Sequence, residues 1–252
     1  MQIDGATLRL SLLEPRSDGV IEGVLSIDLE PGWKTYWKNP GPVGLAPVLN
    51  FGRSVSLGPV RTLFPAPIRF DEAGSSSIGY DQPVLLPFSA NVAGGGRPRV
   101  VLDVTLGLCR ALCVPVSATL QAEATKSLSA RAVALAAASA LPLPGAPGDL
   151  QASYDGSDIL VRIGTPDLPG KPDVFLDGGA AWSFGDPTKP AKHEANGWSL
   201  RLPASVKETR SGDLPSVDIV LTSGEIARSY AGIRVEPVPP AGARPADRTP
   251  QP

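Results

Sequence analysis

The chain has few of the side chains that carry most catalytic chemistry. Its 252 residues include two cysteines, one histidine and one methionine. A single histidine, His193, gives no basis for a histidine-containing zinc cluster or a nucleophile–histidine–acid set, and we interpret it as a solvated loop residue. The glycine run at 94–96 lacks the strand-then-helix context of a phosphate-binding loop and is interpreted as a turn. Hydrolytic, zinc-dependent and nucleotide-dependent activities are therefore not indicated.

An excess of charge of one sign and long apolar runs are also missing. Lysine and arginine total 23 against 25 acidic residues, which are interspersed along the chain and give a net charge of −2. This balance gives no electrostatic footprint for nucleic acid or for an anionic membrane surface, and it favours protein partners. The longest apolar tract, 132–143, is interrupted by Ser139 and Pro142 and is too short to cross a bilayer. We therefore expect no direct insertion into a membrane.

Glycine and proline, in contrast, are abundant. The sequence has 27 glycines and 28 prolines without a repeat or a low-complexity tract. This composition favours many short strands joined by turns, and we predict an all-β protein. Alternating apolar residues predict strands at 6–13, 19–29, 59–64, 77–80 and 83–92, and again at 150–154, 159–163, 173–176, 198–202, 217–222 and 227–235.

The strand pattern is interrupted once, near the middle of the chain. Residues 129–140 are rich in alanine, Ser127 or Ser129 can cap their start and Pro142 ends them, which predicts a helix. The Pro/Gly-rich segment 142–148 is interpreted as an interdomain linker. We predict a first β domain over 1–126, a helix and linker over 127–147, a second β-sandwich domain over 148–236 and a disordered tail over 237–252.

The two cysteines lie in the most informative stretch, 100–124. Alternating residues on both sides predict two strands, and the three residues between Cys109 and Cys113 allow only a tight connection, so we expect a β-hairpin. A disulfide is sterically reasonable in such a hairpin. Three interpretations stay open: a redox-active dithiol, a passive structural disulfide, and a Cu(I) site made by the two thiolates. A disulfide that closes a loop of about five residues stabilises the fold by only ~2 kcal/mol, which favours a bond that opens and closes over a structural one.

Two further segments of the first half have a distinctive composition. Residues 31–47 carry Trp33, Tyr36 and Trp37 among prolines and glycines, and we interpret these aromatics as core residues in preference to direct partner contacts. Residues 69–77 (RFDEAGSSS) are polar and contain glycine, so we expect an exposed loop there.

Several short motifs occur in an order that resembles a known family. They are GWKTYWKNPG at 32–41, FPAP at 64–67, GY at 79–80 before the strand at 84–88, and Cys109-x-x-x-Cys113-x-Pro115. Together they resemble the N-terminal periplasmic domain of the thiol:disulfide interchange protein DsbD, and more closely its relative ScsB, which is associated with suppression of copper sensitivity. The resemblance spans about residues 6–124, and the second β domain also resembles the ScsB-type arrangement.

The resemblance implies an immunoglobulin-like β-sandwich, and hence two such domains joined by the helix and linker. It implies that Cys109 and Cys113 are the catalytic pair of a periplasmic thiol-disulfide oxidoreductase that needs no cofactor. The implied partners are thioredoxin-like domains or proteins and a membrane electron-transfer protein, between which the domain relays reducing equivalents. Residues 1–4 have neither a basic nor an apolar region, so we expect the signal peptide of such a protein to be absent from this chain.

The same analogy assigns roles to individual residues. The incoming thiolate is expected to attack Cys109, and Arg110 either stabilises a thiolate or is a solvated turn residue. Residues 69–77 correspond to the loop that caps the disulfide in the family, so we predict a cap formed by Phe70, Asp71 and Glu72.

Two departures from the family pattern accompany these assignments. The cysteines are closer in sequence than in DsbD-type members, and Ala73 and Gly74 occupy the position of the shielding aromatic, for which Phe70 is the nearest substitute. Two alternatives to the redox role remain. One is a Cu(I)-binding or copper-tolerance protein that uses the same cysteines, against which the absence of internal methionine counts. The other is a non-catalytic binding sandwich with a structural disulfide.

Overall fold

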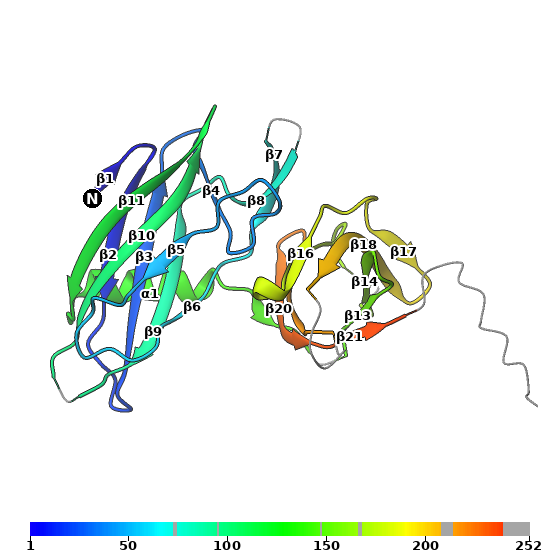
Figure 1. Cartoon of the computed structure of the whole chain (residues 1–252). Coiled ribbons are helices and arrows are strands. Elements are labelled where there is room, and N and C mark those ends of the chain that lie inside the picture. The colour runs from blue at the N-terminus through cyan, green and yellow to red at the C-terminus, as the bar shows by residue number, and fades with distance from the viewer. Residues whose placement is uncertain (73–74, 95, 147, 166–167, 208–213, 239–252) are drawn as a thin grey trace, which may run out of the picture. The chain divides into compact units, whose positions relative to one another are not determined.

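The computed structural model describes residues 1–72, 75–94, 96–146, 148–165, 168–207 and 214–238, without the side chains of Glu72 and Ser75. Strands make up most of the described chain, and α1 (Leu128–Ser139) is the α-helix in it (Figure 1). The predicted all-β class is confirmed. The chain divides into two compact units, Met1–Leu143 and Pro144–Pro252. The predicted tail, 237–252, lies outside the described residues apart from its first two.

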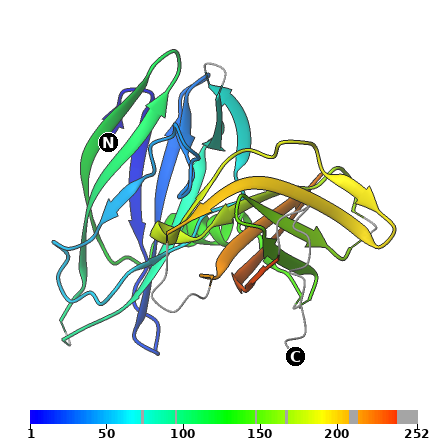
Figure 2. The same ribbon diagram turned by 45° about the vertical axis from the view of Figure 1, so that its right-hand side comes forward.

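The first unit contains two sheets that face each other (Figures 1 and 2). In order across the first sheet, the strands are β1 (Gln2–Ile3), β2 (Ala6–Leu12), β3 (Val20–Leu29), β9 (Val84–Asn91) and β6 (Arg61–Thr62). The second sheet has the order β11 (Cys113–Glu123), β10 (Arg99–Cys109), β4 (Lys34–Tyr36), β8 (Ser75–Tyr80) and β7 (Ile68–Glu72), and β5 (Val48–Asn50) also pairs with β10.

Alternating apolar residues explain why these two sheets pack as a sandwich. Every second side chain of a strand points to the same face, so an alternating strand presents one apolar face. The inward residues of β10 are no more than 1% exposed; they are Val100, Leu102, Val104, Leu106 and Leu108. Residues of the facing sheet are buried in the same way, including Leu8, Ile21, Leu25, Ile27 and Leu86. This immunoglobulin-like core fixes the frame on which the cysteine hairpin is built.

The helix α1 packs on the first unit. Its start is capped by the Ser127 hydroxyl, which accepts a hydrogen bond from the amide of Ala130 at 3.5 Å, as the sequence predicted. Its buried residues, Ala130 and Ala137, lie on the side that contacts β2, β3 and β9. Small side chains allow this close approach of the helix to the sheet.

The second unit also contains two sheets. One has the order β12 (Leu143–Pro144), β20 (Ile226–Ile233), β19 (Val217–Ser223) and β15 (Asp173–Asp177). The other has the order β16 (Trp182–Phe184), β18 (Gly197–Val206), β14 (Asp158–Ile163), β13 (Leu150–Tyr154) and β21 (Val235–Pro237), with β17 (Lys192–Glu194) paired to β18 and a short 3-10 turn, η1 (Gly179–Ala181), before β16. Their shared core is apolar and includes Ile159, Val161, Val174, Leu202 and Leu221.

Three local predictions differ from the structure. Residues 69–72 and 75–77 lie in the paired strands β7 and β8 and not in a loop, because backbone pairing at a sheet edge tolerates the polar side chains on which the loop prediction was based. Only β6 forms within the strand predicted at 59–64, and it pairs with β9 at the edge of the first sheet that lies opposite β1. His193 lies in the short strand β17 with its ring 4.7 Å from that of Trp198, although its side chain is exposed as expected.

Candidate functional site

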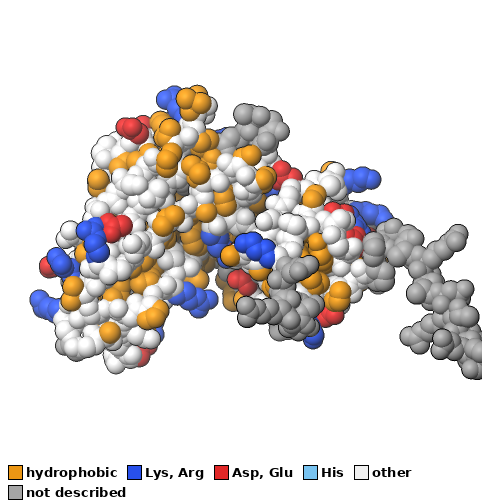
Figure 3. All heavy atoms as spheres, viewed as in Figure 1, with side chains coloured by type: hydrophobic (Ala, Val, Ile, Leu, Met, Phe, Trp, Pro, Cys, Tyr) orange, Lys and Arg blue, Asp and Glu red, His pale blue; other side chains and the backbone are white. Residues whose placement is uncertain are grey.

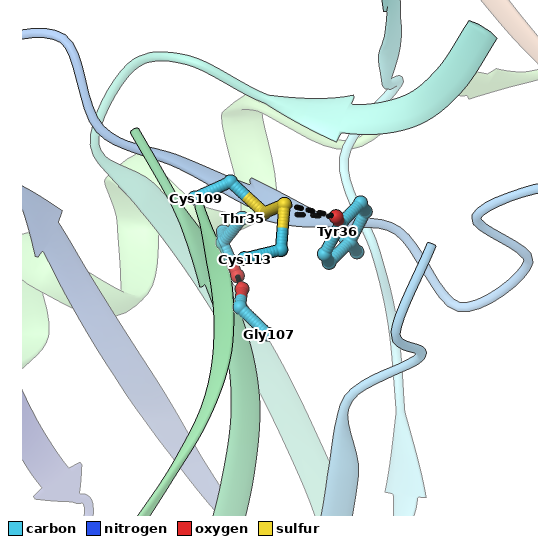
Figure 4. The surroundings of a disulfide bond; sticks show 5 residues. All are labelled: Thr35, Tyr36, Gly107, Cys109 and Cys113. Atoms are coloured by element: carbon cyan, nitrogen blue, oxygen red, sulfur yellow. Dashed lines mark hydrogen bonds between the residues drawn. A yellow bond between two sulfur atoms is a disulfide. The ribbon is translucent and has the colours of Figure 1, made fainter. Parts of the chain in front are cut away.

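The cysteine hairpin forms as the alternating pattern predicts. β10 and β11 pair without a register shift from Arg99 opposite Glu123 to Cys109 opposite Cys113, which is the last pair before the turn. The two cysteines form a disulfide, with their Cα atoms 4.1 Å apart (Figure 4). The disulfide therefore closes the end of the hairpin, beside the turn residues 110–112.

The two cysteines of this bond differ in exposure. Cys109 is 3% exposed because β10 is an inner strand, with Cys109 opposite Cys113 on one side and opposite Lys34 of β4 on the other. Cys113 is exposed because it begins β11, the edge strand of the sheet. A molecule that approaches from solvent consequently meets Cys113 first.

Tyr36 joins the buried side of the disulfide to the core. Its phenol oxygen lies 2.8 Å from Cys109 Sγ and 3.1 Å from Cys113 Sγ (Figure 4). Neither sulfur of a disulfide carries a hydrogen, so the Tyr36 hydroxyl is the donor in both contacts. The residue is 2% exposed, which keeps this donor out of competition with water.

Pairing of β4 with β10 brings Tyr36 to the sulfurs. The hydroxyl of Thr35 donates a hydrogen bond of 3.0 Å to the carbonyl of Gly107, next to the pairing of Thr35 with Leu108. Gly107 has no side chain where the Tyr36 ring lies, and a Cβ atom there would be 2.6 Å from two ring carbons. A glycine inside a strand is a recognised sign of such a close approach. The prediction of core aromatics is confirmed for Tyr36 and Trp37, whereas Trp33 is only half-buried, and the prediction missed the sulfur contact that Gly107 signals.

The predicted cap residues lie in strand β7. Phe70 is half-buried, and its ring centroid is 6.2 Å from that of Tyr36. The Lys34 ammonium lies 4.5 Å from the centre of the Phe70 ring, within the range of a cation–π contact. Asp71 is exposed, and the side chain of Glu72 lies outside the described residues, as do Ala73 and Gly74. The structure thus places Phe70 beside Tyr36, and a cap made by 70–72 stays a prediction.

In the described parts of the chain, no three or more histidine, cysteine, aspartate or glutamate residues gather in a way that could hold a metal ion. Two thiolates alone are the donor set on which the Cu(I) alternative rests, and that alternative stays a prediction. Over the same residues, no helix has both the length and the hydrophobicity needed to cross a membrane.

Comparisons with known proteins agree with this geometry. Residues 11–125 match the family model described as "Thiol:disulfide interchange protein DsbD, N-terminal". No curated protein matches the chain. Among solved structures, the N-terminal periplasmic domain of ScsB from Proteus mirabilis is similar, with a TM-score of 0.74, 22% sequence identity and coverage of 95% of each chain. Residues 11–125 therefore match the N-terminal domain of the DsbD family of thiol:disulfide interchange proteins, and the chain as a whole shares the fold of the ScsB domain.

Proposed function

We propose that this chain is a periplasmic thiol-disulfide exchange module that relays reducing equivalents through Cys109 and Cys113. In this role it is a thiol-disulfide oxidoreductase that passes electrons between a membrane or thioredoxin-like dithiol donor and periplasmic oxidoreductases. The observation that carries the proposal is the asymmetry of the disulfide. One cysteine is open to solvent, and the other is buried with a hydroxyl donor 2.8 Å from its sulfur. The match of residues 11–125 to the model of an interchange family supports it.

The first step is attack by a partner thiolate on the sulfur of Cys113. The Cys109–Cys113 bond breaks, a mixed disulfide forms between the partner and Cys113, and Cys109 leaves as a thiolate. Tyr36 donates a hydrogen bond to the departing sulfur, which stabilises the charge that develops there. Burial of Cys109 argues against the expectation from family analogy that Cys109 is attacked first.

The second step completes the transfer of two electrons. The partner's second thiolate attacks the partner sulfur of the mixed disulfide, so that the partner becomes a disulfide and Cys113 leaves as a thiolate. Both cysteines of this chain are then reduced, and they take up protons from water according to their pKa values. The reverse sequence reduces an oxidised partner, so the same pair can act as acceptor and as donor without a cofactor.

Phe70 has an indirect part in this proposal. Its ring packs beside Tyr36, with the two ring centroids 6.2 Å apart, and so helps to position the Tyr36 ring. Lys34 lies over the Phe70 ring, with its ammonium 4.5 Å from the ring centre. The proposal therefore depends on Phe70 for the orientation of Tyr36.

Trapping of the mixed disulfide tests the assignment of the attacked sulfur. Cys109→Ser and Cys113→Ser proteins are each activated as a mixed disulfide with 2-nitro-5-thiobenzoate and mixed with reduced thioredoxin whose resolving cysteine is serine. Covalent complexes are then followed on non-reducing gels. We expect Cys109→Ser, which keeps the exposed Cys113, to form the complex roughly tenfold faster than Cys113→Ser, which keeps the buried Cys109.

Two other outcomes would contradict the proposal at different points. Faster trapping by Cys113→Ser would reverse the assignment and make Cys109 the attacked sulfur. In the other outcome, neither protein forms a complex with thioredoxin even though dithiothreitol still releases the bound thiobenzoate from both. That result would remove thioredoxin-like proteins as partners.

A further inference from the structure

Two basic side chains flank the buried cysteine. Arg110 follows Cys109 directly in the chain and is exposed, and Lys34 is the cross-strand partner of Cys109 in β4. Within the described residues, neither forms an ion pair, whereas Arg9, Arg16 and Arg53 of the same unit each pair with a carboxylate. The exposed guanidinium of Arg110 is therefore available to an incoming molecule.

The exposed cysteine, in contrast, lies between apolar neighbours. Leu112 is 80% exposed and Val114 is 41% exposed, directly before and after Cys113. The space-filling view shows hydrophobic and basic side chains together at the tip of the β10–β11 hairpin, at the top of the picture (Figure 3). We call Lys34, Arg110, Leu112 and Val114 the disulfide rim.

Asp71 is the one acidic side chain of β7 that the structure describes, and it points away from the disulfide rim. Phe70 faces Tyr36 and Lys34, and alternation along a strand sends the next side chain, Asp71, to the opposite face. The basic charge of the rim is consequently not cancelled by Asp71. A nearby charge is worth most where apolar groups reduce the access of water, as Leu112 and Val114 do once a partner is docked.

From this arrangement we infer that the disulfide rim selects a protein partner whose reactive thiol is set in an apolar surface bearing acidic side chains. The inference rests on the proposed exchange function and adds the chemistry of the partner. Acidic groups around the partner thiol are attracted by Lys34 and Arg110 before the sulfurs meet, which raises the rate of association. Basic groups in the same place are repelled, so partners of opposite charge are discriminated by rate.

Two short synthetic peptides serve as probes. Each contains one cysteine beside a leucine, and the cysteine is flanked by glutamates in one peptide and by lysines in the other. The rate at which each peptide opens the Cys109–Cys113 bond is measured at low ionic strength, and wild type is compared with variants for the same peptide, so that the intrinsic reactivity of each thiol cancels. For the glutamate peptide, we expect Arg110→Gln to slow the reaction about threefold and Arg110→Glu about tenfold.

The charge effect has two further signatures. The lysine peptide is expected to react faster with Arg110→Glu than with wild type, and both differences are expected to shrink as salt is added, because exposed charges are screened. Arg97→Glu is the matched control. It makes the same change of charge at an exposed arginine before the start of β10, at the end of the strand opposite the disulfide, and it is expected to leave both rates within about twofold.

The outcomes separate this inference from the proposed function. Rates of both peptides that Arg110→Glu leaves unchanged, or an equal effect of Arg97→Glu and Arg110→Glu, would overturn the inference while leaving exchange intact. A disulfide that neither peptide opens, and that 2-mercaptoethanol does not open, would overturn the proposed function itself.

Discussion

Tyr36 is the residue on which the account of the disulfide depends most. Its hydroxyl contacts both sulfurs, and its ring occupies the space above Gly107 and beside Phe70. A buried hydroxyl that donates to a departing sulfur lowers the free energy of the thiolate. The sequence predicted the burial of Tyr36 from composition alone, but a contact between residues 73 positions apart depends on tertiary pairing that alternation does not specify.

Removal of the Tyr36 hydroxyl is predicted to slow exchange. Tyr36→Phe keeps the ring and loses the donor to Cys109, which is worth about 1 kcal/mol, so reduction by dithiothreitol is expected to slow about fivefold. The rate of alkylation of Cys109 is measured against pH in two proteins that both carry Cys113→Ser, one with Tyr36 and one with Tyr36→Phe. The pKa of the Cys109 thiol is expected to be higher in the protein with Tyr36→Phe. Tyr80→Phe is the control, because it removes a buried phenol oxygen that donates to the Pro65 carbonyl at 2.9 Å. An equal slowing by both substitutions would show that Tyr36 acts only through packing.

A carboxylate of the second unit gives a prediction about pH. Asp155 accepts hydrogen bonds from the amide of Asp158, the Arg201 guanidinium and the amide of Ser157, which hold the pKa of its carboxyl well below its usual range. A carboxyl whose pKa is lower in the folded than in the unfolded protein stabilises the fold fully above the unfolded value of about 3.9, and this stabilisation declines as the pH falls from there through the lower pKa of the folded state. Asp155→Asn is therefore expected to cost about 1–2 kcal/mol at pH 7 and less at pH 3, where part of the stabilisation is already lost.

Calorimetric unfolding at the two pH values measures this difference. Glu225→Gln, at an exposed position in the β19–β20 turn, is the control and is expected to change stability little at either pH. A loss of stability by Asp155→Asn that is the same at pH 3 and pH 7 would show that the charge of Asp155 contributes nothing.

At the scale of elements, local pattern predicted the structure well where each strand carries its own signal. The cysteine hairpin, helix α1 and the main strands of the second unit lie within a few residues of their predicted bounds, because alternation, a serine cap and proline stops act locally. Strand β7 and the first two residues of β8 were missed because their side chains are mostly polar and β7 is paired at a sheet edge, whereas the rest of β8 was predicted as a strand at 77–80. The three-residue strand β4 was also missed, since it exists only through its pairing with β10 and β8.

The packing of α1 predicts where a stable first domain ends. Ala130 and Ala137 are buried against the sheet of β2, β3 and β9, so a fragment of residues 1–126 would expose that face to water. We expect the fragment 1–143 to unfold at a temperature at least about 5 °C higher than the fragment 1–126. Thermal unfolding followed by circular dichroism measures both. Equal unfolding temperatures would mean that the helix contributes nothing to the first unit and serves as a linker.

At the scale of the whole molecule, the fold and the cysteine pair followed from the sequence, but the different exposure of the two cysteines did not. Composition and alternation predicted an all-β chain, and the motif order predicted the family that residues 11–125 match. Family analogy favoured Cys109 as the attacked sulfur. The different burial of the two cysteines results from the position of β10 inside the sheet and of β11 at its edge, which depends on strand order and not on spacing in sequence.

The reduction potential of the Cys109–Cys113 pair tests the central claim most directly. The protein is equilibrated with glutathione or dithiothreitol buffers of known composition, and free thiols are counted. A potential between roughly −270 and −120 mV, the range spanned by known exchange proteins, is the result that a relay of electrons predicts. A value well below about −300 mV would contradict the account, because the bond would then be a structural disulfide and the first unit a binding module.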